Sequence, residues 1–306
     1  MVNIVRCLFL ITFFTLFTHP KDKVLILTCA FNRPDFIELQ YKTFKAFLND
    51  DYEFVVFNDA NTRATYLKIH ELCKKCKIRC IDLPQDIQRK RNGRPVGHMT
   101  RNGVPIYIDI NRKSPSCFAA DALQYTLDSL GFDHQGIVLY IDADIFLIKE
   151  FSVTEYLKGY DLAGHPQSRD HVEYLWNGII FMNMQTLPNK HTMNFDCGLV
   201  DGKNVDTGGQ IHCYLKENPS LHLRYYNGGR ISLLPQTPEQ LHDLGYDTIT
   251  TNFILSNPSL MELYVDSHFL HYTTASNWNH KPATFHQQKT NLLVNFIDTL
   301  LTQHRS

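Results

Sequence analysis

The chain has little net charge and no long basic stripe. Its 30 lysines and arginines nearly balance 31 aspartates and glutamates, which leaves a formal net charge of −1. Proteins that bind duplex nucleic acid usually carry a basic face, because the phosphate backbone must be neutralised. The composition therefore argues against nucleic acid as a partner. With 43% hydrophobic residues in 306, the chain is otherwise ordinary and long enough to bury a large core.

The chain also lacks an apolar run of the ~20 residues that cross a bilayer. The nearest approach is the stretch 7–17, which follows Arg6 and precedes Lys21. A basic residue before a short apolar stretch is typical of an export signal, and no small-x-small cleavage site precedes Lys21. Residues 1–20 are therefore predicted to be a signal-anchor that associates the protein with a membrane or the secretory pathway. A buried N-terminal element in a cytoplasmic protein is the alternative.

Paired zinc knuckles are missing as well. Cys73, Cys76 and Cys80 have helix-like spacing, but a structural zinc site usually takes two C-x-x-C pairs and this segment offers one. We predict a partly buried helix face there, with one disulfide if the chain is exported. The remaining cysteines are scattered and are expected to lie mostly in the core: Cys7, Cys29, Cys117, Cys197 and Cys213.

Strand and helix patterns alternate in the first half of the chain, and no internal repeat is present. Strands are expected at 23–31, 52–57, 78–83 and 136–147, and helices at 35–48, 66–77 and 117–130. This alternation favours an α/β fold with an open, mostly parallel sheet flanked by helices. The irregular stretch 84–115 is unusually long for a loop, and such loops are often functional.

The densest positive charge of the chain lies in this long loop. It comprises Arg89, Lys90, Arg91, Arg94 and Arg101. A solvated loop is the plain interpretation. A flexible cationic loop that closes over a phosphate is the sharper one.

Two carboxylates, one residue apart, lie in the apolar run 136–147. Such a run predicts a strand buried on both faces, and the alternation of side chains predicts that Asp142 and Asp144 point the same way. Two like charges in a dry place raise each other's pKa unless a cation neutralises them. Because Mn²⁺ and Mg²⁺ take carboxylate oxygens, a metal site is predicted at the end of a central strand. A pair of aspartates that only caps the strand end is the alternative.

Polar residues also follow two other predicted strands. Asn32 and Arg33 come after the first strand, and Asp59 comes after the second. In open α/β sheets, ligands bind beyond the carboxyl ends of the strands. We therefore expect these side chains to converge with the two aspartates on one edge of the sheet, where a ligand would bind. A helix-capping turn at Asn32 and an Asx turn at Asp59 are the alternatives.

The second half of the chain is less regular. A short strand is expected at 160–164, an apolar strand at 176–184, and a histidine-bearing strand at 265–273. A glycine-rich turn at 205–210 is followed by a predicted helix through residue 215. No linker divides the two halves cleanly.

Together these motifs resemble nucleotide-sugar-dependent glycosyltransferases of the GT-A fold, distantly the glycogenin-like members, over most of 23–275. The hallmark of that fold is a D-x-D signature at the end of a buried strand, here Asp142-Ala143-Asp144. The segment 177–183 is similar to its acceptor-side strand, 265–272 to its late histidine segment, and 28–34 to its first nucleotide-binding loop. The histidine–glycine–lysine–proline–tryptophan run of glycogenin-like enzymes is absent.

The resemblance implies one large GT-A (Rossmann-like) domain at 21–290. Its nucleotide-binding half is 21–147, its irregular acceptor half is 148–290, and a C-terminal helix or tail follows at 291–306. The implied activity is a metal-dependent, hexosyltransferase-type transfer from a UDP- or GDP-sugar to a hydroxyl of a glycan, lipid or protein. A sugar nucleotidyltransferase is one alternative, although the first strand lacks a glycine-rich loop after it. A non-catalytic sugar- or nucleotide-binding protein is another.

The resemblance also implies a set of ligands for metal and nucleotide. Asp142 and Asp144 would hold the metal and, through it, the diphosphate, with Ala143 between them. His271 is the expected third metal ligand and His268 is the reserve, since both lie in the late histidine segment. A histidine that simply packs in a strand remains the alternative. Asn32, Arg33 and Asp59 would contact the nucleotide.

The remaining candidates belong to the sugar and acceptor side. Asp144, through the metal, and Asp206 are the predicted catalytic residues. Asp206, which precedes Gly208 and Gly209, is expected to be a general base in an inverting enzyme, or a stabiliser of an oxocarbenium-like centre in a retaining one. A purely local turn residue is the alternative. The predicted substrate-binding residues, for which core or surface positions are the alternatives, are Asp121, Gln124, Trp176, Asn177, Gly178 and Asp206.

Overall fold

The computed structural model describes residues 23–84, 100–101, 104–105, 115–275 and 281–305. The predicted signal-anchor at 1–20 and the arginines at 89–94 lie outside the described residues. Within the described residues, no helix is both long and apolar enough to cross a bilayer.

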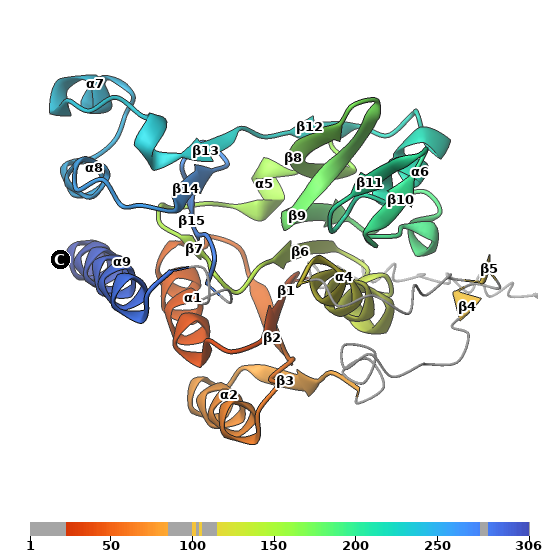
Figure 1. Cartoon of the computed structure of the whole chain (residues 1–306), viewed down its shortest axis with the longest axis horizontal. Helices are drawn as coiled ribbons and strands as arrows, with labels where there is room; N and C mark the ends of the chain where they lie inside the picture. The colour runs from red at the N-terminus through yellow and green to blue at the C-terminus, as the bar shows by residue number, and fades with distance from the viewer. Residues whose placement is uncertain (1–22, 85–99, 102–103, 106–114, 276–280, 306) are drawn as a thin grey trace, which may run out of the picture.

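A seven-stranded mixed sheet forms the centre of the molecule, in the order β12-β8-β9-β6-β1-β2-β3 (Figure 1). Its strands are β1 (Val24–Ala30), β2 (Tyr52–Asn58), β3 (Arg79–Asp82), β6 (Ile137–Ile141), β8 (Leu162–Arg169), β9 (Val172–Asn183) and β12 (Leu223–Tyr225). The pairs β1–β2, β1–β6, β2–β3 and β8–β12 are parallel, whereas β9 runs antiparallel to β6 and β8. The predicted α/β fold with a mostly parallel sheet is confirmed.

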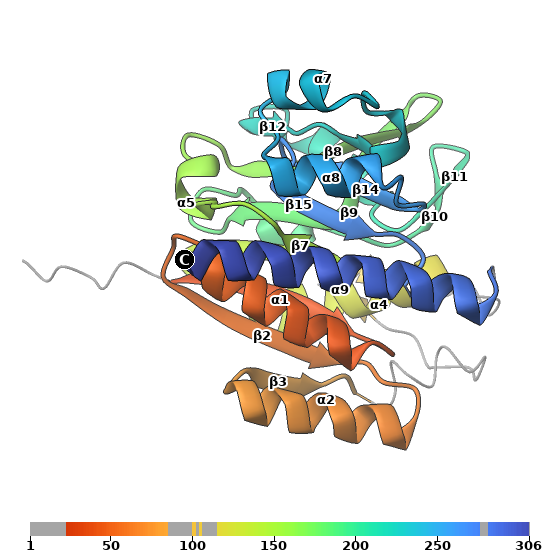
Figure 2. The same ribbon diagram turned by 90° about the vertical axis from the view of Figure 1, so that its left-hand side faces the viewer.

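Each central strand is buried on both faces, which explains its nearly continuous apolar sequence. In β1, Ile26 belongs to a core shared with α1 (Pro34–Phe47), α2 (Arg63–Cys76) and α9 (Ala283–Arg305). Its neighbour Leu27 belongs to a second core, on the opposite face. That face is covered by α4 (Pro115–Thr126), which continues as a π-helical turn (Leu127–Gly131), and by α6 (Ile211–Glu217). Figure 2 shows α9 lying along α1.

A second, four-stranded antiparallel sheet has the order β13-β14-β15-β7. Its strands are β13 (Gly228–Arg230), β14 (Met261–Tyr264), β15 (Phe269–Tyr272) and β7 (Ile145–Leu147). The smaller elements are β4 (Thr100–Arg101), β5 (Val104–Pro105), β10 (Gly198–Val200), β11 (Lys203–Val205), α5 (Val153–Tyr156), α7 (Pro238–Asp243), α8 (Thr248–Leu255) and three 3₁₀ turns or π segments at 127–131, 190–192 and 231–233.

The single strand expected at 136–147 is wrong. The chain leaves β6 at Ile141, turns, and enters β7 of the second sheet at Ile145. The backbone N–H of Ile145 donates to the Asp142 carbonyl at 3.1 Å, which closes the turn. Asp142 and Asp144 therefore flank a turn between two sheets instead of alternating along one strand.

Two predictions at the C-terminal end also need correction. Residues 265–268 form a turn, so the strand expected at 265–273 is confined to β15 and excludes His268. The C-terminal helix α9 begins at Ala283, well before the expected residue 291, and it packs against α1 and α8.

Candidate active site

A cavity of about 420 Å³ opens where β1, β2 and β6 end. Apolar side chains form much of its wall, and amide and carboxylate groups gather at the strand ends. Its lining includes the six residues predicted to contact metal or nucleotide: Asn32, Arg33, Asp59, Asp142, Ala143 and Asp144. The other lining residues are Cys29, Phe31, Phe36, Pro115, Phe118, Ala119, Ala122, Tyr140, Thr274 and Ala275. Their convergence agrees with the placement of ligands at the carboxyl edge of an open sheet.

The acidic turn is held from both sheets and from one helix. The Asp142 N–H donates to the Gly178 carbonyl of β9 at 2.8 Å, and the Tyr272 N–H of β15 donates to the Asp144 carbonyl at 2.8 Å. The buried Gln40 amide of α1 donates to the Asp142 and Ile145 carbonyls at 2.8 and 2.9 Å. Because these bonds satisfy the turn's backbone, both carboxylates are presented to the cavity on a rigid support.

The Asp142 carboxylate sits in an environment that penalises negative charge. Burial, followed by the charge of Asp144, raises the pKa of Asp142 well above its usual range. The Tyr140 hydroxyl donates to Asp142 Oδ1 at 3.2 Å and offsets part of that penalty. The expectation that neighbouring charges raise the pKa in the absence of a cation is met at Asp142.

His271 lies between two carboxylates. Its Nε2 is 3.7 Å from Asp144 Oδ1, and its Nδ1–H donates to Glu262 Oε2 at 3.1 Å. Burial lowers the pKa of His271, but the interactions with Asp144 and Glu262 outweigh burial and raise it to about 9. The hydrogen bond with His271 in turn lowers the pKa of Glu262. We call Asp142, Asp144, Glu262 and His271 the pocket cluster.

Glu262 is a site residue that the sequence analysis missed. It lies on β14 directly opposite His271 of β15 in the hairpin register. It also accepts a hydrogen bond from the Tyr264 hydroxyl at 2.8 Å. A carboxylate that accepts from one imidazole nitrogen fixes the ring and aims the other nitrogen, an arrangement common behind metal-binding histidines.

His268 does not join this cluster. Its Nδ1 bonds to the Val265 carbonyl at 2.7 Å, and its ring packs on Phe151 at 5.2 Å. Of the two histidines proposed as the third ligand, only His271 is near Asp144.

Helix α9 brings a second unpredicted residue to the site. The Lys289 ammonium donates to the Thr273 carbonyl at 2.7 Å and lies 3.5 Å from the centre of the Tyr272 ring. Burial lowers the pKa of Lys289 to about 7, although the charge of Asp144 opposes this change. Its distance from the motifs in sequence explains why no pattern pointed to it.

Asn32 and Arg33 approach the cavity from the loop between β1 and α1. Among the described residues, Asn32 Oδ1 is a buried atom with no hydrogen-bond partner, so it is suited to receive a ligand's donor. Arg33 bonds Asp35 through Nε and Nη2 at 3.0 and 2.6 Å, and its guanidinium lies 3.6 Å from the Phe36 ring centre. Asp59, after β2, is buried with 5% exposure.

Trp176, Asn177 and Gly178 lie on β9 next to the acidic turn. The Trp176 ring stacks on Tyr264 at 4.5 Å and is 5.2 Å from the His271 ring. A Cβ atom at Gly178 would fall 2.2 Å from the Trp176 ring, so this position has room only for glycine. Asn177 is buried. These residues border the pocket cluster, and their contact with a sugar stays a prediction.

The three remaining predicted residues lie on α4 and on the turn that follows β11. Asp206 is exposed and its Oδ1 accepts from the Thr207 N–H at 2.8 Å, a local turn contact. Gln124 donates to Asp128 at 3.1 Å and accepts from the Phe195 N–H at 3.0 Å, so both ends of its amide are engaged. Asp121 is half-buried on α4. Their roles in catalysis or substrate binding stay predictions.

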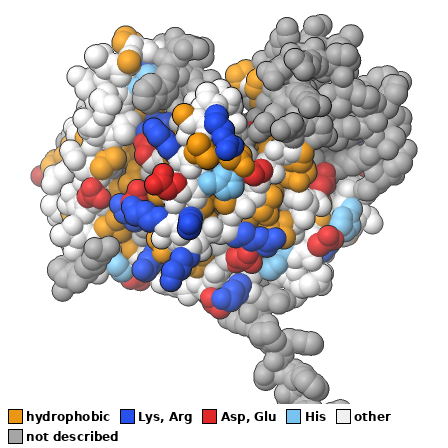
Figure 3. Space-filling view, turned by 90° about the horizontal axis from the view of Figure 1, so that it is seen from below, with side chains coloured by type: hydrophobic (Ala, Val, Ile, Leu, Met, Phe, Trp, Pro, Cys, Tyr) orange, Lys and Arg blue, Asp and Glu red, His pale blue; other side chains and the backbone are white. Residues whose placement is uncertain are grey.

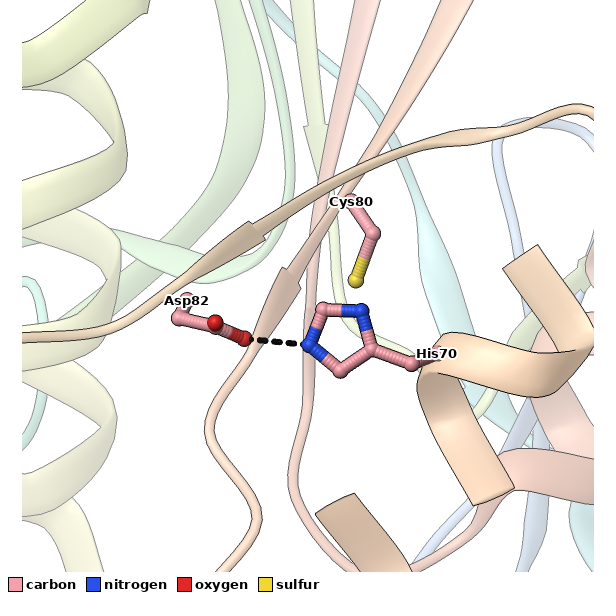
Figure 4. A group of neighbouring side chains, drawn as sticks. All are labelled: His70, Cys80 and Asp82. Carbon is pink, nitrogen blue, oxygen red and sulfur yellow. Dashed lines mark hydrogen bonds and ion pairs between the residues drawn. The ribbon is translucent and has the colours of Figure 1, made fainter. Parts of the chain in front are cut away.

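A different group has the tightest packing of potential metal ligands in the described part of the chain. His70, Cys80 and Asp82 each offer a ligand atom, and these atoms lie within 4.8 Å of one another (Figure 4). Three ligand atoms of the pocket cluster do not come together within this spacing. We call these three residues the edge cluster.

The edge cluster joins α2 to the edge strand β3, away from the cavity. Asp82 accepts from the Tyr66 hydroxyl and pairs with His70, both at 2.7 Å. The side chains of His70 and Asp82 are 36% and 44% exposed. Figure 3 views the molecule from this side and shows basic and acidic side chains interspersed. We therefore interpret the edge cluster as a surface hydrogen-bonded pair that holds the helix, because both of its side chains are well exposed and neither lines the cavity.

The chain was also compared with known proteins. No protein-family model matches it, and no curated protein matches its sequence. The similar solved structures include the galactosyltransferase LgtC with donor and acceptor sugar analogs, 13% identical with a TM-score of 0.42, over 88% of this chain and 95% of its own.

Two further solved structures are as distant. The mannosyltransferase PcManGT from Pyrobaculum calidifontis, in complex with GDP-Man and Mn²⁺, is 11% identical with a TM-score of 0.42, over 68% of this chain and 55% of its own. The glycosyltransferase GlyE of Streptococcus pneumoniae TIGR4 is 15% identical with a TM-score of 0.41, over 92% of this chain and 62% of its own. These values concern the fold and carry no conclusion about activity.

Proposed function

We propose that the protein is a metal-dependent glycosyltransferase of the hexosyltransferase type. It would move a sugar from a UDP- or GDP-sugar to a hydroxyl of a glycan, lipid or protein acceptor. The observation that carries this proposal is the Asp142–Asp144 turn, which presents two carboxylates to a cavity with His271 beside them. Half-buried carboxylates are costly to keep unless a cation or proton neutralises them.

The donor atoms fit a divalent cation that accepts oxygen ligands and one imidazole, such as Mn²⁺. Two ligands of one such cation, each at ~2.1 Å, lie roughly 3–4 Å apart, and His271 Nε2 is 3.7 Å from Asp144 Oδ1. Asp142 accepts from Tyr140 through Oδ1, so its other carboxylate oxygen would hold the cation. When bound, the metal would neutralise the charge that develops on the departing diphosphate.

The other residues of the cavity would bind and orient the donor. Asn32 Oδ1 would accept a hydrogen bond from the nucleotide, and buried Asp59 would accept one from a ribose hydroxyl or the base. Arg33 would contribute positive charge near the phosphates. The apolar wall of α4, including Phe118 and Ala119, would exclude water from the nucleotide.

The acceptor half of the domain would bind the second substrate, the acceptor. Trp176, Asn177 and Gly178 would border the donor sugar, and Asp206 would take the proton of the acceptor hydroxyl or stabilise the reacting centre. Asp206→Asn should slow transfer more than it weakens donor binding. If steady-state kinetics showed an equal loss of transfer rate and of donor binding, Asp206 would have only a structural role in its turn, where it accepts a hydrogen bond from Thr207.

A screen of UDP- and GDP-sugars tests the activity. Purified protein with Mn²⁺ should release free nucleotide from at least one donor, and release should stop with a chelator. UDP or GDP should raise the melting temperature only when Mn²⁺ is present. Nucleotide binding without turnover of any donor would favour a non-catalytic binding protein, and pyrophosphate release from a nucleoside triphosphate would favour a nucleotidyltransferase.

Membrane association through residues 1–20 is a separate proposal. The full chain should sediment with membranes and a chain lacking these residues should not. Equal distribution of both in a membrane fractionation would remove the proposal.

A further inference from the structure

Two thiols from distant parts of the sequence meet beside the candidate active site. Cys117, in the first turn of α4, and Cys197, directly before β10, are 80 residues apart, and their Sγ atoms lie 2.7 Å from each other. Non-bonded heavy atoms normally rest about 3.5–4.0 Å apart, and a disulfide joins its sulfurs at ~2.05 Å. The two sulfurs are therefore closer than packing alone requires.

The backbone around the two cysteines is already held in place. The Thr207 hydroxyl donates to the Ser116 carbonyl at 2.7 Å, and the Phe195 N–H donates to Gln124 Oε1 at 3.0 Å. These bonds lie on both sides of the thiol contact and join the same two segments. A covalent link between the sulfurs would thus require little backbone movement.

We propose that Cys117 and Cys197 are a disulfide site. The oxidant is a disulfide reagent, such as the oxidised dithiol of a thiol–disulfide oxidoreductase or glutathione disulfide. Two S–H bonds break, one S–S bond forms, and the two electrons and two protons reduce the oxidant's own disulfide to thiols. From the sequence, both cysteines were predicted to be core residues, and a disulfide was predicted only among Cys73, Cys76 and Cys80.

The link would join the two sides of the candidate site. On one side, Pro115, Phe118 and Ala119 of α4 line the cavity. On the other, the Gly208 N–H donates to the Phe195 carbonyl at 2.7 Å, so the segment before Cys197 holds the turn that carries the predicted carboxylate. Closing an 80-residue loop also restricts the unfolded chain strongly. The consequence for turnover rests on the proposed function, but the bond itself does not.

Non-reducing peptide mapping tests the bond directly. Full-length protein is incubated with glutathione disulfide, its remaining thiols are alkylated, and the digest is analysed by mass spectrometry. We expect one cross-linked peptide pair that contains Cys117 and Cys197. Recovery of both peptides as alkylated monomers, or a cross-link from Cys117 to a different cysteine, would overturn the proposal.

Melting temperatures give an independent measurement. Dithiothreitol should lower the melting temperature of the oxidised protein by about 5 °C or more. The shift should vanish in Cys117→Ser and in Cys197→Ser, and it should persist in the matched control Cys213→Ser, whose side chain is exposed. A reductant-dependent shift that survives in Cys117→Ser would contradict the assignment. None of these measurements depends on donor turnover, so their failure would leave the proposed activity standing.

Discussion

The pocket cluster and the edge cluster both place a histidine beside a carboxylate, but they differ in how far their side chains are exposed to water. In the pocket cluster, the side chains of His271 and Asp144 are 13% and 19% exposed. In the edge cluster, those of His70 and Asp82 are 36% and 44% exposed. If only the distances between ligand atoms counted, the edge cluster would be the better candidate for a metal site, since its three ligand atoms are the more tightly grouped.

When burial is considered as well, the pocket cluster becomes the better candidate. Around the pocket cluster the low local dielectric strengthens each charge interaction, and the pKa of His271 is raised to about 9. At the edge, water screens the His70–Asp82 pair, and such pairs contribute little. A site for chemistry is thus distinguished less by the closeness of its ligands than by the cost of their charges and by an adjacent cavity.

The largest contrast should come from matched carboxylate substitutions. Asp144→Asn removes a proposed metal ligand in the pocket cluster and should reduce donor turnover by about 10³-fold or more, measured as nucleotide release. Asp82→Asn makes the same chemical change at the edge and should leave turnover within about twofold. Circular dichroism of both variants checks that the fold is retained. Equal activity of the two variants would refute the assignment of the pocket cluster.

A smaller effect is expected behind the proposed metal ligand. Glu262→Gln keeps the size of the side chain but weakens its hold on His271 Nδ1–H, so Mn²⁺ affinity should fall by about 10–100-fold. Titration calorimetry with Mn²⁺ measures this directly. Glu239→Gln, on exposed α7, is the control and should bind Mn²⁺ as the unaltered protein does. Unchanged affinity in Glu262→Gln would leave this residue with a packing role only.

The pocket cluster should also make stability depend on pH in the metal-free protein. The folded-state pKa of His271 is raised from 6.5 to about 9, so its contribution is fully present below about pH 6.5 and is lost as the pH rises through 9. The raised pKa of Asp142 acts in the same direction, with loss beginning above its ordinary value. Mn²⁺ displaces protons, so its stabilising effect should grow from pH 6 to pH 9. Melting curves with and without Mn²⁺ test this, and a constant or shrinking metal effect would contradict it.

The smallest effect belongs to the edge cluster. His70→Ala should destabilise the protein by about 0.5 kcal/mol in a denaturant titration, because it removes one exposed ion pair. Adding Zn²⁺ should leave the melting temperature of the unaltered protein within about 1 °C. Stabilisation by Zn²⁺ that disappears in His70→Ala would make the edge cluster a metal site and would break the comparison.

The first half of the fold could be predicted because its strands are buried on both faces. The run 23–31 is almost entirely apolar after Lys23, and it corresponds closely to β1 (Val24–Ala30). The convergence of Asn32, Asp59 and Asp142 at one cavity also followed from the rule that ligands gather at the strand ends.

The turn at the acidic motif was not predicted, because the buried residues on both sides of it form one apolar run in the sequence. Ile141 and Ile145 are both fully buried, but in different sheets. An apolar pattern reports burial and does not say which sheet a residue joins. Asp142 therefore lies after a buried strand, as predicted, but in a turn that leads to the second sheet and not within one continuous strand.

Glu262 and Lys289 were missed because tertiary packing alone brings them to the site. Glu262 reaches His271 through the β14–β15 hairpin, so a correct reading of the turn at 265–268 would have placed it opposite the histidine. Lys289 arrives on the last helix, and no local signal in the sequence connects it with Tyr272.

The position of α9 has a consequence for how the protein is made. The helix that carries Lys289 onto the Tyr272 ring follows every other described element along the chain. Because synthesis runs from the N-terminus, the β-strands and their acidic turn emerge before this helix. A partly synthesised chain without α9 would therefore leave the Tyr272 ring uncovered until the helix is made and docks.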